Sequence, residues 1–207
     1  MTPLAPFAVR ARDLRADEVL SLGWAGAPSH LDAVAAELRR RDAGQVDYLA
    51  VCGPRDVPLG IGGVDHVRHE GAGTIYQLAV QPALQSHGLG TLLVRALEAR
   101  VRARGADRVM LLVGVDNPRA QALYERLGYR EAGTETDRWS YVDDTGRSVD
   151  VADECVLMVK ELWPTRCVGA GLAPPLRLMS ERPGRGAMPG GWCPPSPAFS
   201  PSREQPQ

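Results

Sequence analysis

A glycine-rich turn separates a β-type segment from the most regular helical pattern in the chain. The turn covers residues 85–91 (QSHGLGT), and apolar residues then recur at i, i+3 and i+4 as far as Val101. A strand, a glycine turn and a helix start together offer free backbone N–H groups and the positive end of a helix dipole, which suit a pyrophosphate. Glycine at positions 88 and 90 would also let a ligand approach without a Cβ in the way. A tight turn that only starts a helix is the alternative interpretation.

Other phosphate motifs are missing from the sequence. It contains no G-x-x-x-x-G-K-[ST] segment, so a P-loop kinase or ATPase is not supported. The turn also lacks the three-glycine pattern of dinucleotide-binding folds. The phosphates that this turn suits therefore belong to a different cofactor.

A second group of polar residues lies within residues 117–129 (NPRAQALYERLGY). Asn117 before Pro118 is typical of a helix start, since Asn is a preferred N-cap and Pro is preorganised at the first helical position. Tyr124 follows about two helical turns later and so projects near the face of Asn117. From spacing alone, a helix cap and a packing tyrosine explain these residues as well as a ligand site does.

Taken in chain order, these segments resemble two motifs of the GNAT acyltransferase superfamily. Residues 78–82 (LAVQP) with 85–90 (QSHGLG) are similar to that family's acetyl-CoA loop, whose pattern is Q/R-x-x-G-x-G/A, and residues 117–129 are similar to its second motif. The resemblance covers about residues 7–162. It implies an N-acetyltransferase that transfers the acetyl group of acetyl-CoA to a primary amine of a small molecule or protein. A catalytically silent module that binds acyl-CoA or another protein is the alternative on the same fold.

The resemblance also implies a fold and a cofactor site. The expected fold is an α/β (α+β) GNAT fold, with a mixed, strongly bent central sheet that splays open and is flanked by helices. Backbone groups of residues 78–80 would pair with the pantetheine arm, which Asn117 would also contact, and N–H groups of residues 86–91 would hold the pyrophosphate. The expected cofactor-binding residues are Leu78, Ala79, Val80, Gln85, Ser86, His87, Gly88, Leu89, Gly90, Thr91 and Asn117. Family members frequently carry a basic residue where this chain has Ser86 and His87, so we expect phosphate affinity to rest mainly on backbone donors.

The implied chemistry needs an acid and a base. An amine attacks the thioester carbonyl and the sulfur leaves; by resemblance, Tyr124 protonates the departing thiolate, and a backbone N–H near Val80 steadies the oxyanion. Some family members carry a Glu on the central strand, but residues 74–80 (TIYQLAV) contain no carboxylate. The proton acceptor therefore stays open. The candidates are a water relayed by Tyr76 or Gln77, and the loop acids Glu70 and Glu135.

The acceptor amine is expected to meet the variable region at residues 15–45 and the loop at residues 133–139. Four residues close to this loop would suit an acidic, partly aromatic site for a cationic amine: Asp137, Trp139, Asp143 and Asp144. A solvated hairpin explains the same residues equally well.

Two further constellations could bind a metal or form a nucleophile pair. Residues 65–70 (DHVRHE) hold two His and two acids, but residues three apart in a strand point to opposite faces, so a solvated hairpin end is favoured over a metal site. Cys52 and His66 fall on expected neighbouring strands, although nothing orients the imidazole. The cysteines form no C-x-x-C pair, so neither zinc nor a disulfide framework is indicated: Cys52, Cys155, Cys167 and Cys193. We expect no metal.

The elements that must position these residues follow from periodicity and turn signals. Strands are expected at residues 7–12, 47–52, 59–67, 74–80, 108–113, 138–142 and 154–160, with another near Tyr129. Helices are expected at residues 15–22, 29–41, 89–101 and 117–128. The second, third and fourth strands should form an antiparallel meander, Ser29 should begin a capping arrangement, and residues 143–146 (DDTG) should form a hairpin turn.

Composition places these elements in one domain. The 207 residues are 44% hydrophobic and carry a formal net charge of -1, so no overall positive field attracts nucleic acid or an anionic membrane. No apolar run reaches the roughly 20 residues of a membrane-spanning helix, and residues 1–13 lack a signal-peptide core, so we expect a cytoplasmic protein. We expect it to be a monomer or a homodimer. Residues 1–162 are the expected acetyltransferase domain. Residues 163–207 are rich in Pro and Gly and are expected to be a disordered tail.

Overall fold

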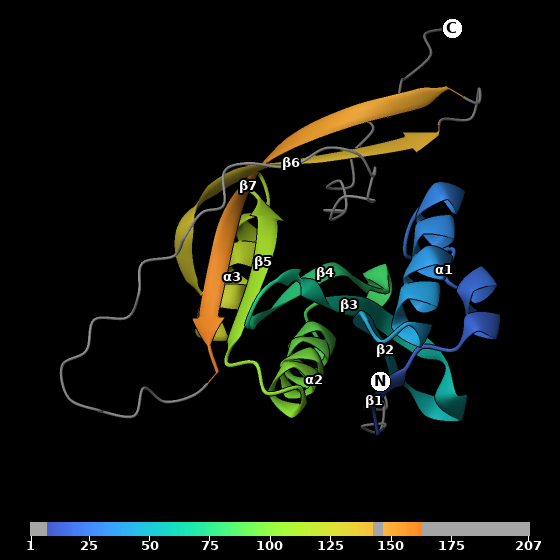
Figure 1. Cartoon of the computed structure of the whole chain (residues 1–207). Helices are drawn as coiled ribbons and strands as arrows, with labels where there is room; N and C mark the ends of the chain where they lie inside the picture. The colour runs from blue at the N-terminus through green and yellow to red at the C-terminus, as the bar shows by residue number, and fades with distance from the viewer. Residues whose placement is uncertain (1–7, 143–146, 163–207) are drawn as a thin grey trace, which may run out of the picture.

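A computed structural model describes residues 8–142 and 147–162 of the chain. Within these ranges a seven-stranded mixed sheet has the order β1-β2-β3-β4-β5-β7-β6 (Figure 1). The strands are β1 (Arg10–Asp13), β2 (Val46–Cys52), β3 (Pro58–His69), β4 (Ala72–Val80), β5 (Arg108–Gly114), β6 (Arg130–Val142) and β7 (Ser148–Glu161). The α-helices are α1 (Pro28–Asp42), α2 (Leu89–Ala103) and α3 (Pro118–Arg126), and the 3₁₀ turns are η1 (Ala16–Ser21), η2 (Pro54–Asp56) and η3 (Pro82–Leu84). No helix in the described ranges is long and apolar enough to span a membrane.

Most expected elements are present, and several differ in detail. β2, β3 and β4 form the predicted antiparallel meander, whereas the segment expected as a helix at residues 15–22 is the 3₁₀ turn η1. The capping arrangement at Ser29 is wrong: α1 begins at Pro28 with Ala27 as N-cap and no side-chain cap. Proline has no N–H to satisfy at that position, so the helix starts there without a capping side chain. The turn expected at residues 143–146 and the tail expected at residues 163–207 lie outside the described residues.

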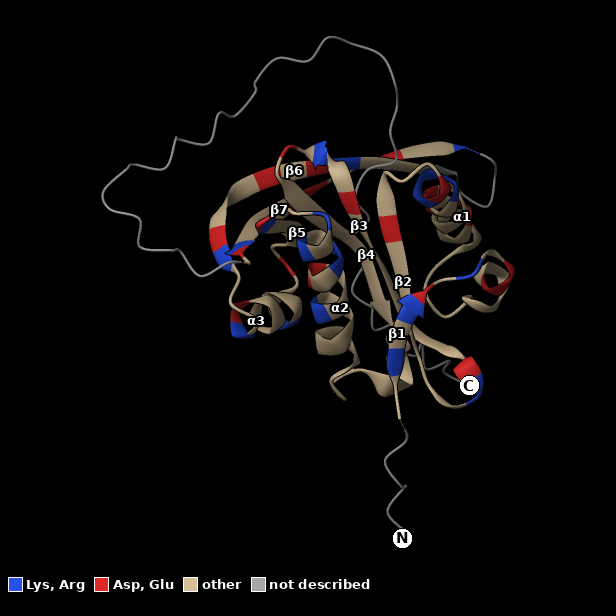
Figure 2. Cartoon of the chain, turned by 60° about the horizontal axis from the view of Figure 1, so that its bottom comes forward, with Lys and Arg blue, Asp and Glu red and all other residues tan. Residues whose placement is uncertain are grey.

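Two hydrophobic clusters cover opposite faces of the sheet. Because successive strand residues point to opposite faces, Leu49 and Val51 of β2 pack into the cluster that contains α2, while Tyr48 and Ala50 pack into the cluster that contains α1. This explains why every residue of β2 is buried. Figures 1 and 2 show α2 and α3 on one side of the sheet and η1 and α1 on the other.

The sheet is irregular at the middle of β4. Gly63 pairs with Tyr76 and Ile61 pairs with Ala79, so the single residue Gly62 stands opposite both Gln77 and Leu78. Such a bulge bends the strand that carries the extra residue. Gln77 adopts a left-handed conformation with φ of 51°, and its buried side chain accepts a hydrogen bond of 3.0 Å from the hydroxyl of Tyr48. The hydrogen bond holds a backbone conformation that non-glycine residues seldom adopt.

β4 and β5 diverge just where the bulge begins. Their parallel pairing runs only from Ala72 with Arg108 to Ile75 with Leu111, although both strands continue beyond these residues. β5 instead keeps its pairing with β7 over its whole length. The two strands therefore separate at the centre of the sheet (Figure 1).

β6 and β7 extend beyond the end of β5. The pairing of β7 with β5 stops at Cys155, but β6 and β7 remain paired as far as Val142 with Ser148. Residues 135–142 and 148–154 thus form a two-stranded extension, which we call the arm. Figure 1 shows that the arm reaches past β5 toward the side of the sheet that carries α1.

The helix α2 lies close against β4 because glycine occupies the contact. A Cβ on Gly73 would overlap Cγ2 of Val101 and lie 2.9 Å from Cγ2 of Val64. Val101 is fully buried, so its stiff, β-branched side chain has no free space into which it can turn. Gly73 therefore sets how closely α2 approaches the strand.

We expect Gly73→Ala to lower the free energy of unfolding by about 1–3 kcal/mol, the usual cost of overpacking a core. Chemical denaturation with linear extrapolation measures the change. Gly23→Ala is the matched control, since no atom lies within 4 Å of a Cβ at that position. Equal stabilities for the two variants would show that the contact between α2 and β4 is not tight.

Candidate active site

Two cavities meet in the opening between β4 and β5. The larger, about 410 Å³, lies beside the turn before α2, and we call it the loop-side cavity. The smaller, about 80 Å³, lies beneath the arm, and we call it the arm-side cavity. Residues that line both are Leu78, Asn117, Ala120 and Tyr124. The two cavities are thus the two ends of one cleft.

Most of the site residues expected from the sequence surround the loop-side cavity. Those that line it are Leu78, Val80, Gln85, Ser86, Gly88, Gly90, Thr91, Asn117 and Tyr124. The side chains of the other three lie elsewhere. Ala79 packs against the α1 cluster, Leu89 is buried in the α2 cluster, and His87 is exposed with its Nδ1 2.8 Å from the carbonyl oxygen of Gln85. Any contribution from Ala79 and Leu89 to this cavity therefore comes from their backbone.

The turn before α2 presents backbone donors. Ser86 and Gly88 both have positive φ, 66° and 84°, and Gly88 is the N-cap of α2 without a side-chain cap. The first N–H groups of a helix have no acceptor within the helix, and the helix dipole makes this end positive. The first turn of α2 contains no acidic residue that would oppose an anion. This geometry suits phosphate oxygens.

Arg119 adds a positive charge that the sequence analysis missed. From the first turn of α3 its guanidinium donates to Oε1 of Gln85 at 3.2 Å and to Oγ of Ser86 at 2.6 Å. It also lines the loop-side cavity, as does Arg126. A phosphate group at this turn would therefore meet a cationic side chain beside the backbone donors. Arg119 lies within the segment 117–129 that the sequence analysis singled out. It is 33 residues from Ser86 in sequence, however, and only the fold brings the two side chains together.

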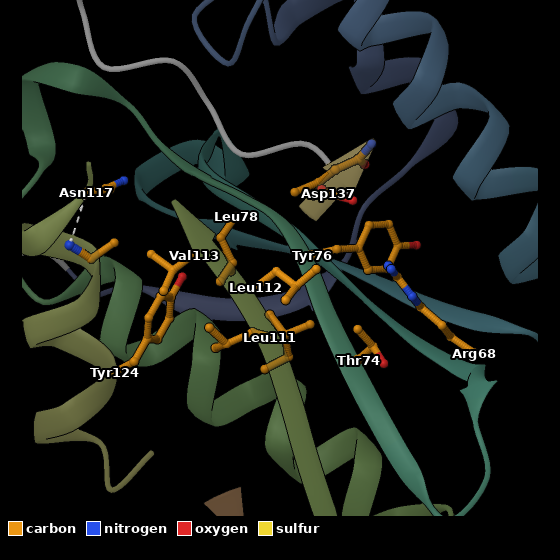
Figure 3. A pocket seen from close by; sticks show the side chains of 13 residues that line it. Arg68, Thr74, Tyr76, Leu78, Leu111, Leu112, Val113, Asn117, Tyr124 and Asp137 are labelled. Atoms are coloured by element: carbon orange, nitrogen blue, oxygen red, sulfur yellow. Dashed lines mark hydrogen bonds between the residues drawn. The ribbon is translucent and has the colours of Figure 1, made fainter. Parts of the chain in front are cut away.

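Asn117 and Tyr124 hold the junction between the cavities. Oδ1 of Asn117 accepts a hydrogen bond of 3.1 Å from the N–H of Ala120, so the residue is the N-cap of α3 (Figure 3). Among the described residues, nothing accepts from its amide nitrogen, which leaves that donor for a ligand. Tyr124 is 8% exposed and packs edge-on against Tyr129, with ring centroids 5.8 Å apart. Packing thus fixes the ring while Tyr124 still lines the cleft.

One edge of β4 is open along the cleft. Beyond Ile75 its backbone groups have no partner on β5 within the described strands, and Leu78 and Val80 line the loop-side cavity. An unpaired strand edge can bind an extended ligand as if it were another strand. The amide groups of a pantetheine arm have the donors and acceptors that such an edge requires.

The arm-side cavity contains the polar residues Arg68, Tyr76 and Asp137. The hydroxyl of Tyr76 donates to the carboxylate of Glu37 at 2.5 Å, and burial together with Glu37 raises the pKa of Tyr76 above its ordinary value. Asp137 is 6% exposed, and burial raises the pKa of its carboxyl. Figure 3 shows Tyr76 and Asp137 facing the same space.

The structure narrows the candidates for the proton acceptor. Glu70 and Glu135 are exposed and line neither cavity, and the side chain of Gln77 is bound to Tyr48. Of the acidic, partly aromatic group near residues 133–139, Asp137 enters the arm-side cavity, while Trp139 donates to Asp153 at 3.0 Å. Asp143 and Asp144 lie outside the described residues.

The side chains of residues 65–70 bind different partners, and Cys52 lies away from His66. Asp65 bonds to Arg40, His66 lies 2.8 Å from Asp47, and His69 lies 2.9 Å from Thr74. In the described part of the chain, no group of three or more His, Cys, Asp or Glu side chains is arranged to hold a metal. The pairing of Cys52 with His66 is wrong, because Cys52 pairs with Pro58 at the end of β3 remote from His66.

Comparison with known proteins identifies relatives of this chain. The family described as acetyltransferase (GNAT) family matches residues 13–129. A mycothiol acetyltransferase of Beutenbergia cavernae is 53% identical over 58 residues, which are 28% of this chain and 19% of that protein. One of Streptosporangium roseum is 46% identical over 61 residues, 30% of this chain and 18% of that protein. The chain thus spans about a fifth of the length of these curated relatives.

Solved structures share the fold at low sequence identity. The ribosomal-protein-S18-alanine N-acetyltransferase of Escherichia coli is 19% identical, with a TM-score of 0.59 over 80% of this chain and 99% of that one. An N-acetyltransferase from Staphylococcus aureus is 13% identical, with a TM-score of 0.60 over 75% and 99%. A PaiA N-acetyltransferase of Thermoplasma acidophilum, solved with coenzyme A, is 12% identical, with a TM-score of 0.56 over 74% and 99%. These likenesses confirm the expected fold.

Gly90→Val should weaken binding of coenzyme A by about tenfold or more, because its side chain would enter the loop-side cavity and block phosphate hydrogen bonds. A Cβ at Gly90 would make an ordinary contact of 3.4 Å with Leu123, so the backbone there accepts a side chain. Calorimetry measures the affinity, and Gly90→Ala should have a smaller effect. Gly88→Val is less informative because φ there is 84°. Unchanged affinity in folded Gly90→Val would exclude the cavity as the phosphate site.

Arg119→Ala should lower the affinity for coenzyme A by about 10- to 100-fold, the usual loss when a charge-assisted hydrogen bond is removed. The affinity of the variant should also depend less on salt concentration, since fewer charges take part. Arg95→Ala is the control: this exposed arginine of α2 lines neither cavity. If both variants bind equally well, Arg119 only braces the turn.

Proposed function

Because the chain belongs to the acetyltransferase (GNAT) family, we propose that it transfers the acetyl group of acetyl-CoA to a primary amine of a small molecule or protein. One observation carries the proposal: a single cleft joins an anion-binding helix start, an open strand edge and a buried tyrosine. The features follow one another in the order in which pyrophosphate, pantetheine and thioester follow one another along acetyl-CoA.

The residues of the loop-side cavity fit acetyl-CoA. The N–H groups at the start of α2 and the guanidinium of Arg119 would hold the pyrophosphate, and the open edge of β4 would pair with pantetheine. The amide nitrogen of Asn117 would donate to a carbonyl of the same arm. When bound, acetyl-CoA supplies an activated acyl group at the junction of the two cavities.

The residues at the junction would then promote transfer. A backbone N–H of the bulged part of β4 would donate to the thioester oxygen as negative charge develops on it. Tyr124 would give its phenolic proton to the sulfur as the carbon–sulfur bond breaks. The packing of Tyr124 on Tyr129 keeps the hydroxyl in place, so less conformational entropy is lost when it is oriented for proton transfer.

The acceptor would enter from the arm-side cavity, which adjoins the junction and contains polar side chains. A cytoplasmic location and a monomeric or homodimeric state stay predictions, as does the absence of nucleic acid and membrane from its partners.

We expect Tyr124→Phe to lower kcat by about 10- to 100-fold while the affinity for acetyl-CoA changes less than a few-fold, since the change removes the proton and keeps the ring. Release of free CoA thiol with a panel of primary amines measures turnover. Tyr129→Phe makes the same change on the neighbouring ring, which lines neither cavity, and should keep the wild-type kcat. A wild-type protein that binds acetyl-CoA but acetylates no amine would instead be a silent acyl-CoA-binding module.

A further inference from the structure

Asp137 differs from every other buried acid in the described part of the chain. The remaining five each have a cationic partner within 3.1 Å. They are Glu18 with Arg12, Glu37 with Arg40, Asp47 with His66 and Arg104, Asp65 with Arg40, and Glu98 with Lys160. For Asp137, no described side chain forms a hydrogen bond or ion pair with the carboxylate, although the residue is 6% exposed. A buried carboxylate without a cationic side chain beside it is costly, and the described residues supply none, so the position suits a bound cation.

The position of Asp137 shows where such a cation would come from. The residue lines the arm-side cavity together with Tyr76, Asn117 and Tyr124, and Figure 3 shows its side chain beside the cavity. Tyr124, the acid proposed above, lines the same space. A group bound by Asp137 would therefore lie within the same small cavity as the proposed thioester position.

The arm adds a second acid next to the first. Asp153 of β7 is the register partner of Asp137 on β6, and side chains of directly opposed residues lie on the same face of a strand pair. Asp153 accepts a hydrogen bond of 3.0 Å from Nε1 of Trp139, which fixes its orientation. Two carboxylates and an indole on one face favour a cation.

Arg68 does not supply the missing charge. It lines the same cavity, but its side chain is exposed and forms no ion pair with Asp137 in the described structure. Its positive charge lowers the pKa of Asp137, as does the backbone N–H of Arg138, while Asp153 and Glu135 raise it. Burial is the largest influence, and the pKa of Asp137 is raised overall.

We propose that Asp137 binds the acceptor's amino group and takes its proton during acetyl transfer. This inference rests on the proposed function and adds the base that the sequence analysis left open. It also states the acceptor class: an amine whose nitrogen reaches the arm-side cavity.

The proton balance of the step is simple. The neutral amine nitrogen bonds to the carbonyl carbon and becomes positively charged, which makes its N–H acidic. Asp137 takes that proton, the carbon–sulfur bond breaks, and Tyr124 protonates the sulfur. An amide and free CoA thiol leave, and exchange with water moves the proton of Asp137 back to the phenolate of Tyr124. A base is most effective when its pKa lies near the working pH, and the raised pKa brings Asp137 closer to it.

We expect Asp137→Asn to lower kcat/KM for amines by about 100-fold or more, the usual effect of removing a general base, with unchanged affinity for coenzyme A. The probes are putrescine, spermidine, tyramine and a peptide with a free N-terminus. In the wild type, kcat/KM should rise with pH through the raised pKa of Asp137, because only the ionised form accepts a proton; the variant should lose this step. Asp150→Asn removes an equal charge from an exposed position of β7 and should change neither quantity.

A second measurement does not depend on activity. A carboxyl whose pKa is raised in the folded state destabilises the fold above the ordinary pKa of Asp, where the unfolded chain loses the proton more readily. It has no such effect below that pKa, where it is protonated in both states. Asp137→Asn should therefore have a higher melting temperature than the wild type at pH 7, and the difference should vanish in acid.

These experiments test the role of Asp137 separately from the proposed acetyl transfer. Equal amine kinetics in Asp137→Asn and Asp150→Asn, or a destabilised Asp137→Asn protein, would overturn the role of Asp137 and leave the proposed acetyl transfer standing. A wild type that binds coenzyme A but acetylates none of the probes would overturn the transfer reaction and this inference with it.

Discussion

The bulge in β4 is the feature on which the cleft depends. An uninterrupted β4 would continue its pairing with β5, and the opening that holds both cavities would close. Gln77 is held at positive φ by a hydrogen bond from Tyr48 in the α1 cluster. Packing on one face of the sheet thus maintains the irregularity that opens its centre, and the strain is compensated by a buried contact.

Charge is distributed unevenly along the cleft. The loop-side end has the positive start of α2 and Arg119. The arm-side end has the carboxylate of Asp137, which has no side-chain partner among the described residues, with Asp153 beside it. Apolar residues such as Leu78 and Leu111 line the cleft between them. The net charge of the whole chain, -1, hides this polarity, because local fields near a cavity depend on a few groups rather than on the total.

The presence or absence of a cationic partner distinguishes the other buried acids from Asp137, the proposed base. Glu37 binds Arg40 and Tyr76, and Glu98 binds Lys160, so these buried carboxylates stabilise contacts between elements. Asp137 has no such partner among the described side chains. A fold keeps a costly group of this kind where function requires it, and perturbed carboxyl groups in clefts are common at active sites.

Local sequence determined most of the elements and the turn before α2. Periodicity predicted α2 and the meander. Asn117 with Pro118 predicted the start of α3, and the glycine turn predicted a helix start with free N–H groups, because each of these features depends on neighbouring residues. Only the tertiary structure decided the rest. Arg119 reaches the turn and Asp137 enters the cleft because strand order and the bulge bring remote segments together, and no local pattern encodes such contacts.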